Sequence, residues 1–334
     1  MSNFSATSAA KACAAACANI AFIKYWGNRD HRINLPSNGS ISMNLAMLKT
    51  VTHVEFDKGF TSDELIINDV LVTGPGLFRM QRFLDQVRRI AEVQWYARVY
   101  SQNNFPMSAG LASSASGYAA LSLASTKALN LHLNDRELSS LARLGSGSAA
   151  RSIPGGFVEW YASETHEGSF AASFADPDYW DLVDVIVIVQ DAAKETASSQ
   201  GHVLADTSPI QPVRTKGASG RLAVCRQAIL ERDFSAFSEV VELDSMLMHA
   251  AMMTSTPALI YWEPVTLQII KSVKKWRGEG LQVCSTIDAG ANVHLLCLTK
   301  DVPEIQELVR KIPGVLSLII SQAGGPAQII EKAP

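Results

Sequence analysis

The sequence predicts an α+β fold in two domains, residues 1–185 and 186–334. The length of 334 residues suits one large domain or two domains of ordinary size. The β-branched run Val183–Gln190 is typical of a buried strand, and we place the domain boundary beside it. From this run onward the patterns indicate a strand, several helices, two strands, a helix and a last strand, which is an α+β order.

The first half is predicted to contain strands and three helices. Gly76–Glu92 carries apolar residues on one face at helical spacing, and Ala115–Leu129 is strongly helical. Asn134 or Asp135 is suited to cap a third helix, Asp135–Gly145. The predicted strands are Ala10–Tyr25, Ser40–Lys49, Val51–Asp57, Glu64–Val72 (a hairpin that turns at Asn68-Asp69), Trp95–Ser101 and Phe157–Tyr161.

In the second half, a polar segment, Ala192–Pro212, precedes a group of helices. His249 lies in a helix rich in Met and Ala, where packing in the core or at an interface is its expected role. The predicted helices are Ser219–Leu230, Phe234–Met253, Pro264–Gly278 and Pro303–Ile312, and the predicted strands are Leu281–Ile287, Val293–Leu298 and Val315–Ser321.

The composition argues against several classes of protein. With 47% hydrophobic residues, a net charge of −3 and no long basic run, the chain is globular, and nucleic acid is not expected as its main partner. The five cysteines are scattered among apolar residues, which argues against a disulfide framework and favours a reducing compartment. No apolar run reaches the length of a membrane span, and no His or Cys spacing suits a metal site. We therefore expect a cytoplasmic protein.

A loop of small residues, Asn103–Gly117, leads into the predicted helix Ala115–Leu129. Such a loop lets backbone N–H groups approach an anion without side chains in the way, and a helix N-terminus adds free donors and partial positive charge. Ser113 and Ser114 could add hydroxyl donors to phosphate oxygens. The stretch lacks the Gly-Lys-Ser/Thr ending of the Walker loop, and it could instead be a tightly packed helix start.

Charged residues stand in two further stretches that are rich in small residues. Asp288 follows a predicted buried strand and precedes Ala-Gly, so its carboxylate could act as a base or positioning group, or could cap its own turn. Arg151 lies in the Ser/Gly-rich stretch 146–156, where it could bind a carboxylate or phosphate or be an ordinary surface arginine. Lys24 and Tyr25 end the first strand and could bind an anion or be solvated. Together these residues suggest an anionic small substrate and a nucleotide.

These motifs resemble those of a known family. The segment Pro106–Ala115 is similar to the ATP-binding signature of the GHMP kinase superfamily. The narrower resemblance is to the mevalonate diphosphate decarboxylases. It is carried by five motifs in order, Ala18–Gly27, Asn103–Gly117, Arg143–Ser152, Gly155–Trp160 and Asp288–Asn292, with weaker matches at Asp244-Ser245, His249-Ala250 and Lys194–Ser199.

The resemblance implies a fold, a reaction and an assembly. The fold is the two-domain GHMP fold, α+β with mostly antiparallel sheets, in which the active site lies in a cleft between an N-terminal ATP-binding domain and a C-terminal domain. The enzyme would use ATP and Mg2+ to phosphorylate the tertiary 3-hydroxyl of a mevalonate phosphate, and the new phosphate would leave as the carboxylate departs as CO2. A homodimer is implied as well, and Met246–Met253 is a candidate for its packing surface.

The resemblance also assigns roles to individual residues. The implied catalytic group is Asp288, Arg151, Ser148 and Lys24, in which Asp288 positions or deprotonates the 3-hydroxyl and Arg151 binds the C1 carboxylate. The implied substrate-binding residues are Tyr25, Asn28, Arg79, Ser146, Ser148 and Arg151, of which Tyr25 and Arg79, with Lys24, face the 5-phosphate end or the transferred phosphoryl group. The implied ATP-binding residues are Ser101, Gly110, Ala112, Ser113, Ser114 and Ser198, and magnesium is expected to be held through the ATP phosphates.

Departures from the family bear on the substrate. Family members usually read Tyr-Trp-Gly-Lys-Arg-Asp, and here Asn28 replaces the lysine that helps to neutralise a diphosphate. Each phosphate adds about −1.5 to −2 charge, so loss of this cation disfavours a diphosphate relative to a monophosphate. Ala150, Pro154 and His202 replace a common Cys, aromatic residue and Met. We hypothesise that mevalonate 5-phosphate is converted to isopentenyl phosphate, with mevalonate 5-diphosphate as the alternative substrate.

Two other classes of function are weighed against this hypothesis. A mevalonate-type kinase of the same superfamily would stop at phosphorylation, but the presence of both Asp288 and Arg151 argues for decarboxylation. A non-catalytic protein that senses ATP or a metabolite is disfavoured because every charged position that the family chemistry needs, apart from Asn28, is filled.

Overall fold

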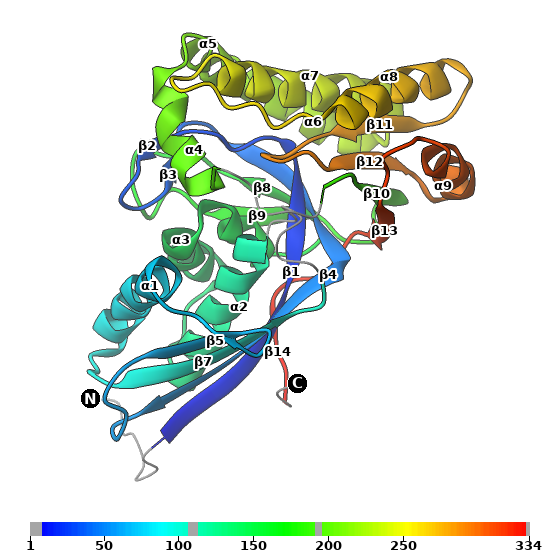
Figure 1. The fold of residues 1–334 in the computed structure, drawn as a ribbon. Helices are drawn as coiled ribbons and strands as arrows, with labels where there is room; N and C mark the ends of the chain where they lie inside the picture. The colour runs from blue at the N-terminus through cyan, green and yellow to red at the C-terminus, as the bar shows by residue number, and fades with distance from the viewer. Residues whose placement is uncertain (1–8, 106–112, 191–195, 332–334) are drawn as a thin grey trace.

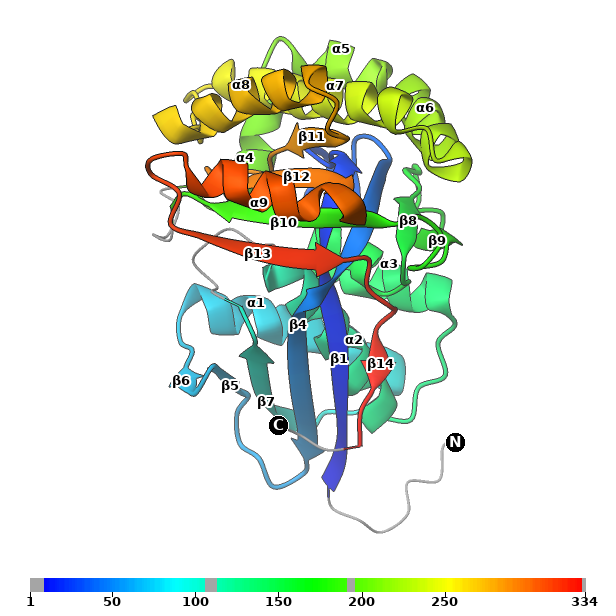
Figure 2. The ribbon, with the colours of Figure 1, turned by 90° about the vertical axis from the view of Figure 1, so that its right-hand side faces the viewer.

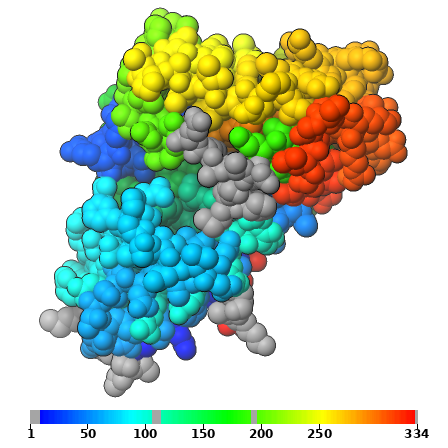
Figure 3. Space-filling model, in the orientation of Figure 1, coloured from blue at the N-terminus to red at the C-terminus, as the bar shows by residue number. Residues whose placement is uncertain are grey.

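The chain folds around two β-sheets. The computed structural model describes residues 9–105, 113–190 and 196–331, and the structural statements below refer to these residues. In the space-filling view, the first half of the chain forms the lower part of the molecule and the second half forms the upper part (Figure 3). With helices packed on both sheets and mostly antiparallel pairing, this is the predicted α+β class (Figures 1 and 2).

The larger sheet is built on two long antiparallel strands, β1 (Ala9–Ile23) and β4 (Ser40–Asp57). The strand order is β14-β1-β4-β7-β5-β6, and β8 and β9 extend the sheet from the N-terminal end of β4. Strands β5 and β7 run parallel to each other. The remaining strands are β5 (Glu64–Ile67), β6 (Val70–Leu71), β7 (Tyr96–Asn103), β8 (Phe157–Trp160), β9 (Ala171–Ala175) and β14 (Gln328–Ile329).

Three helices pack on this sheet and on one another: α1 (Pro75–Ala91), α2 (Ser113–Ala128) and α3 (Asp135–Gly145). Both β1 and α2 are rich in alanine, so the helix can approach the strand closely. Asn134 caps α3 in a capping box. This packing brings Ser114, at the start of α2, next to Ser146, just after α3, with their hydroxyl oxygens 3.3 Å apart.

The smaller sheet has the order β11-β12-β10-β13, with antiparallel neighbours. One face of β10, which includes Val183 and Val185, packs on α8 and α9, and the other face, which includes Ile186, packs on α6, α7 and β1. Burial on both faces explains why this strand is apolar except at Asp184, which is buried and lies 2.7 Å from His294 on β12. The elements are β10 (Leu182–Ile188), β11 (Val283–Thr286), β12 (Val293–Leu298), β13 (Ser317–Gln322), α6 (Ala218–Glu231), α7 (Phe234–Met253), α8 (Pro264–Gly278) and α9 (Val302–Arg310).

One hydrophobic core joins the two halves of the chain. Phe237 of α7 meets Phe22 of β1 edge to face, with ring centroids 5.0 Å apart, and meets Trp180 at 5.1 Å. Such pairs add about 0.5–1.5 kcal/mol beyond the area that they bury. The end of β1 is therefore held in place by the second half of the chain, and Lys24 follows directly after it.

Short elements complete the end of the molecule at which β1 stops. The hairpin of β2 (Asn28–Asp30) and β3 (Leu35–Pro36) lies near α4 (Ser198–Leu204), and α5 (Gln211–Lys216) follows (Figure 1). No helix among the described residues is long and apolar enough to cross a membrane.

Several predicted elements have the predicted bounds, and others need correction. Helices α7 and α8 and strand β12 are confirmed residue for residue. The two strands predicted at Ser40–Lys49 and Val51–Asp57 are one strand, because Thr50 continues the pairing with both β1 and β7. The segment Ala192–Pro212 is not simply polar connection, since it contains α4 and the first residues of α5.

The packing predictions for cysteines and for α7 can be compared with the structure. All five cysteines are free and buried, as expected. His249 is buried, which confirms its packing role. Met248 and Met252 are also buried inside the chain, so the prediction that Met246–Met253 forms a dimer surface is wrong for this side of the helix.

Phe237→Ala is expected to destabilise the protein by about 3–5 kcal/mol, because it removes a fully buried ring and leaves a cavity at the junction of the two halves. The measurement is the urea midpoint of unfolding, followed by circular dichroism. Val224→Ala, on the exposed surface of α6, is the control and should shift the midpoint little. Equal shifts for the two variants would contradict the central place of this ring.

Candidate active site

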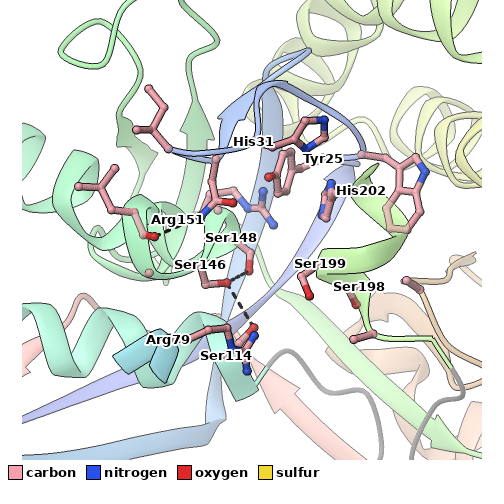
Figure 4. Close-up of a pocket in the computed structure, with 18 of the residues that line it drawn as sticks. Tyr25, His31, Arg79, Ser114, Ser146, Ser148, Arg151, Ser198, Ser199 and His202 are labelled. Atoms are coloured by element: carbon pink, nitrogen blue, oxygen red, sulfur yellow. Dashed lines mark hydrogen bonds between the residues drawn. The ribbon is translucent and has the colours of Figure 1, made fainter. Parts of the chain in front are cut away.

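A pocket of about 590 Å³ lies between the two halves of the chain. The first half lines it with the end of β1, the segment after β2, α1, the start of α2 and the segment after α3. The second half lines it with α4, α7 and the loop between β11 and β12. Figure 4 shows the side chains converging on this space. Its walls therefore bring together segments from almost the whole length of the chain.

An ion pair spans the two halves inside this pocket. Lys24, just after β1, places Nζ 2.6 Å from Oδ1 of Asp288, in the loop after β11. The lysine side chain is 1% exposed and the aspartate side chain 31% exposed, so the pair is desolvated on the lysine side and open to the pocket on the other. The carboxylate is therefore both fixed by a partner and accessible to a ligand.

The two partners keep each other charged. Burial alone would raise the pKa of Asp288, but the charge and hydrogen bond of Lys24, together with the nearby His294 and Arg151, outweigh it and bring the pKa down to about 2. Burial also lowers the pKa of Lys24, and Asp288 opposes that shift. A carboxylate with so low a pKa is ionised at neutral pH and is a weak base. It is better suited to orient a hydroxyl group than to remove its proton early in a reaction.

The backbone of Lys24 is clamped by charged side chains from the second half. The Lys24 N–H donates to Oδ2 of Asp244 in α7 at 2.6 Å, and Arg214 of α5 donates to the Lys24 carbonyl at 2.7 Å. Arg221 of α6 completes the network with a bond of 2.6 Å to Oδ1 of Asp244. Asp244 is fully buried, and its charge is balanced by these arginines. Three helices thus fix the position from which Lys24 reaches Asp288.

Arg151 stands on the floor of the pocket in the short 3-10 helix Gly147–Ser152. Its Nε and Nη2 donate to Oδ1 of Asn19 at 3.1 and 3.0 Å, and Nη1 donates to Ser40 Oγ at 2.8 Å. Burial lowers its pKa to about 10, which still leaves it protonated at neutral pH. A guanidinium has five N–H groups, so donors remain for a ligand. The group is suited to bind a carboxylate.

Hydroxyl groups and a helix N-terminus line another side of the pocket. Ser114 Oγ lies 3.3 Å from Ser146 Oγ, which lies 3.4 Å from Ser148 Oγ (Figure 4). Ser113 begins α2, whose first N–H groups have no partner within the helix. Ser198 faces the pocket from α4, in the second half. This arrangement suits phosphate oxygens, with donors from both halves of the chain.

The end of the pocket around Tyr25 is lined mainly by uncharged groups, and the cation that also lines the pocket there, Arg32, is paired with Asp30 at 2.7 Å. Tyr25 donates its hydroxyl hydrogen to Oδ1 of Asn28, and burial raises the pKa of this phenol. Asn28 Nδ2 lies 3.4 Å from His31 Nδ1. The other ring nitrogen of His31, Nε2, lies 3.2 Å from Oδ2 of Asp206. Asn28 is buried behind Tyr25 and is not among the residues that line the pocket.

The structure gathers most of the predicted site residues in the pocket, with some exceptions. Arg79 and Ser114 lie at the end away from Tyr25 and His202 (Figure 4), so Arg79 is placed with the hydroxyl groups rather than with Tyr25. Ser101 is buried in β7, where its hydroxyl pairs with Thr52 at 3.0 Å, and it does not line the pocket. The ATP contact expected of it stays a prediction. Gly110 and Ala112 lie outside the described residues.

Sequence reasoning missed several residues that line the pocket. Asn19 accepts hydrogen bonds from Arg151. The sequence could have indicated this residue, because it is the one polar residue in the otherwise apolar second part of β1, up to Ile23. His31 lines the pocket without belonging to a recognisable pattern, and Ser199, which also lines it, ends the matched segment Lys194–Ser199 but was given no role of its own. Arg82, which was not among the predicted site residues, lines the pocket together with Arg79, also on α1.

The arrangement defines a class of enzyme. The pocket contains two desolvated cations, Lys24 and Arg151, an ionised carboxylate, Asp288, and a helix N-terminus with hydroxyl groups. Phosphoryl transfer to a small anionic alcohol requires such groups. Among residues 9–105, 113–190 and 196–331 there is no cluster of His, Cys, Asp and Glu that could hold a metal ion by itself.

The chain belongs to the mevalonate diphosphate decarboxylase family. Residues 16–171 match the family model described as the diphosphomevalonate decarboxylase-like N-terminal domain. Residues 184–323 match that of the mevalonate 5-diphosphate decarboxylase C-terminal domain. The resemblance stated from the motifs is thereby confirmed, and so is the prediction that the chain is a decarboxylase.

Individual relatives agree with this assignment. The diphosphomevalonate decarboxylase of Saccharomyces cerevisiae is 35% identical over 317 residues, which cover 89% of this chain and 80% of the relative. The phosphomevalonate decarboxylase of Haloferax volcanii is 32% identical over 312 residues, which cover 93% of this chain and 95% of the relative. A solved structure of MDDEF in complex with MVAPP, AMPPCP and magnesium has a TM-score of 0.92 and 34% identity, over 97% of this chain and 100% of that one. The predicted two-domain GHMP fold is confirmed by this likeness.

The pKa of Asp288 predicts how stability depends on pH. Its ionisation stabilises the folded protein above its ordinary pKa of 3.8, and this contribution is lost as the pH falls toward about 2. Asp288→Asn lacks it, so the difference in urea midpoint between wild type and variant should narrow as the pH falls from about 5 to about 2. The exposed Glu164→Gln serves as the control, with a small difference throughout. A difference for Asp288→Asn that stays constant over this range would contradict the ion pair.

Proposed function

We propose that the enzyme converts mevalonate 5-phosphate to isopentenyl phosphate, with ATP as the phosphoryl donor and ADP, phosphate and CO2 as the other products. Membership of the family supports ATP-dependent decarboxylation of a phosphorylated mevalonate. Relatives bear the names of both diphosphomevalonate and phosphomevalonate decarboxylases, so the choice between the two substrates has to come from the site itself.

The observation that carries the choice is the neutral end of the pocket around Tyr25. Asn28 stands where family members usually have a lysine, and its amide contacts Tyr25 and His31. Arg32 also lines the pocket, but its guanidinium is paired with Asp30 at 2.7 Å, and Asp206 adds a further negative charge beside His31. A second phosphate would bring about −1.5 to −2 further charge to this end. The monophosphate avoids that cost.

Asp288 and Lys24 would act on the 3-hydroxyl of the substrate. The carboxylate accepts a hydrogen bond from this hydroxyl and aims its oxygen at the γ-phosphorus of ATP. Because the pKa of Asp288 is about 2, the proton is transferred late, when the new P–O bond is largely formed. Lys24 holds the carboxylate in place and adds positive charge near the phosphoryl group that is being transferred.

Arg151 would bind the C1 carboxylate with the donors that Asn19 and Ser40 leave free. After phosphorylation, the bond between C1 and C2 breaks and its electron pair forms the double bond between C2 and C3. The bond between C3 and oxygen breaks at the same time, and phosphate leaves with the electron pair of this C3–O bond. Arg151 fixes the carboxylate in the orientation that this fragmentation needs, and Ser146 and Ser148 hold substrate oxygens.

ATP would lie with its phosphates against Ser113, Ser114 and Ser198, and Mg2+ would arrive as part of the ATP complex. Both are found, as AMPPCP and magnesium, in the MDDEF structure that this chain resembles. The metal ion supplies neutralisation of the charge that develops on the phosphates. Arg79 and Arg82, on the wall formed by α1, add cations at this end of the pocket.

The alternative substrate is mevalonate 5-diphosphate, which the names of most of the matched relatives favour. Purified enzyme is therefore to be assayed with mevalonate, its 5-phosphate and its 5-diphosphate, with ADP and CO2 both measured. We expect kcat/KM for the 5-phosphate to exceed that for the 5-diphosphate by at least about tenfold, since a difference of one charged contact is worth about 1.5–3 kcal/mol. A preference for the diphosphate refutes the proposal, and ADP without CO2 would indicate a kinase.

Asn28→Lys is expected to move the preference toward the diphosphate by about tenfold in the ratio of kcat/KM values, because it restores a cation at the neutral end. Asn28→Met is the matched control, since it removes the amide without adding charge. If both variants change the ratio alike, lost packing rather than charge is the cause, and Asn28 does not set the substrate.

Asp288→Asn is expected to lower kcat by about a thousandfold or more, because the amide can neither accept the proton nor balance Lys24. ATP binding, measured by calorimetry, should be nearly unchanged, since the proposed ATP residues lie elsewhere in the pocket. A variant that retains a tenth of the wild-type activity would show that Asp288 is not the catalytic carboxylate.

A further inference from the structure

His202 is a pocket residue to which the reaction described above gives no role. It lies in α4, lines the pocket and is half-buried. Its ring stacks on Tyr25 with centroids 4.1 Å apart and lies 4.8 Å from the ring of Trp26. Figure 4 shows His202 next to Tyr25 at the neutral end of the pocket. The ring is therefore held in a defined orientation between the two halves of the chain.

One ring nitrogen of His202 is already occupied. The backbone N–H of Gly27 donates to Nδ1 at 3.0 Å, so Nδ1 must carry a lone pair. Burial lowers the pKa of His202 to about 3, which leaves the ring uncharged at neutral pH. A neutral imidazole with a lone pair on Nδ1 carries its proton on Nε2. The backbone of Gly27 thus fixes the tautomer.

The second ring nitrogen, Nε2, is a hydrogen-bond donor that the described residues leave without an acceptor. Among the described residues, Nε2–H of His202 has no hydrogen-bond partner. The neighbouring Tyr25 cannot take over its role, because the phenol hydrogen is directed to Asn28. A pocket-lining N–H that the protein leaves unpaired is satisfied by a ligand or by water. Because the His202 ring is uncharged, its Nε2–H can supply a hydrogen bond to a ligand acceptor but adds no positive charge.

We propose that Nε2–H of His202 donates to the 5-phosphate of the substrate and that His202 is a specificity-determining residue. The inference rests on the proposed function for the position of the 5-phosphate near Tyr25. It assigns the recognition of this phosphate to a neutral donor of fixed tautomer. A terminal monophosphate gains a directed hydrogen bond, while a longer diphosphate gains no compensation for its extra charge.

Two substitutions separate the donor from the anchor. His202→Asn can keep an acceptor for the Gly27 N–H, since its Oδ1 takes the place of Nδ1, but it has no group at the position of Nε2. His202→Gln places an amide N–H near the position of Nε2. Both are assayed as full-length enzyme, with KM for mevalonate 5-phosphate, KM for mevalonate 5-diphosphate, KM for ATP and kcat measured for each.

His202→Asn should raise KM for mevalonate 5-phosphate about tenfold, the value of a hydrogen bond to a charged group, while KM for ATP stays within about twofold. His202→Gln should stay within about threefold of wild type for both. Equal losses in the two variants, a parallel rise in KM for ATP, or no change in His202→Asn would each overturn the assignment. A wild-type preference for the diphosphate refutes the proposed function alone, because the comparison of Asn with Gln can then be made on that substrate.

Discussion

The ion pair between Lys24 and Asp288 is the interaction on which the rest of the site depends. Its partners are 264 positions apart in the sequence, and each half of the chain supplies one charge. Neither sheet contains the site alone. Taking two charges out of water is costly, and the attraction between them offsets this cost only when the geometry is well maintained. The remaining structure of the pocket can be understood as the means by which that geometry is kept.

Two different devices maintain the pair. The apolar core around Phe22 and Phe237 fixes the end of β1 against α7, and the buried network of Asp244, Arg214 and Arg221 grips the backbone of Lys24. Because the network binds the N–H and the carbonyl rather than the ammonium, Nζ stays available to Asp288. The cost of burying Asp244 is met by two arginines and one backbone donor. A structural charge network thus fixes the position of Lys24 without competing for its ammonium group.

The parts of this structure that were predictable from the sequence are those with a local signature. The β-branched run of β10, the apolar stripe of α1 and the cap at Asn134 each reflect the physics of a few neighbouring residues. The motifs around Lys24, Arg151 and Asp288 were identified because their residues are adjacent in the chain.

The parts that were not predictable depend on contacts between distant segments. Asp244 belongs to a weak motif match in a helix expected to have a packing role, and nothing near it in the sequence reveals that it meets the backbone of Lys24. The contacts from Asn28 through His31 to Asp206 join two segments, 28–31 and the 3-10 helix Ala205–Thr207, that have no pattern in common. Strands β9 and β14 are short and are fixed by the strands beside them, β8 and β1, rather than by their own residues.

The distribution of charge along the pocket follows from what each part of a substrate does during the reaction. In the proposed reaction, Lys24, Arg151, Arg79 and Arg82 would lie where a phosphoryl group is transferred and a carboxylate is lost, and there charge would be redistributed in the transition state. The 5-phosphate of the proposed substrate would not react, so its binding energy would be the same before and during the chemical step. Interactions that are equal in both states lower KM but do not raise kcat. Neutral donors are sufficient for such a group, and placing the cations elsewhere uses them where they accelerate the reaction.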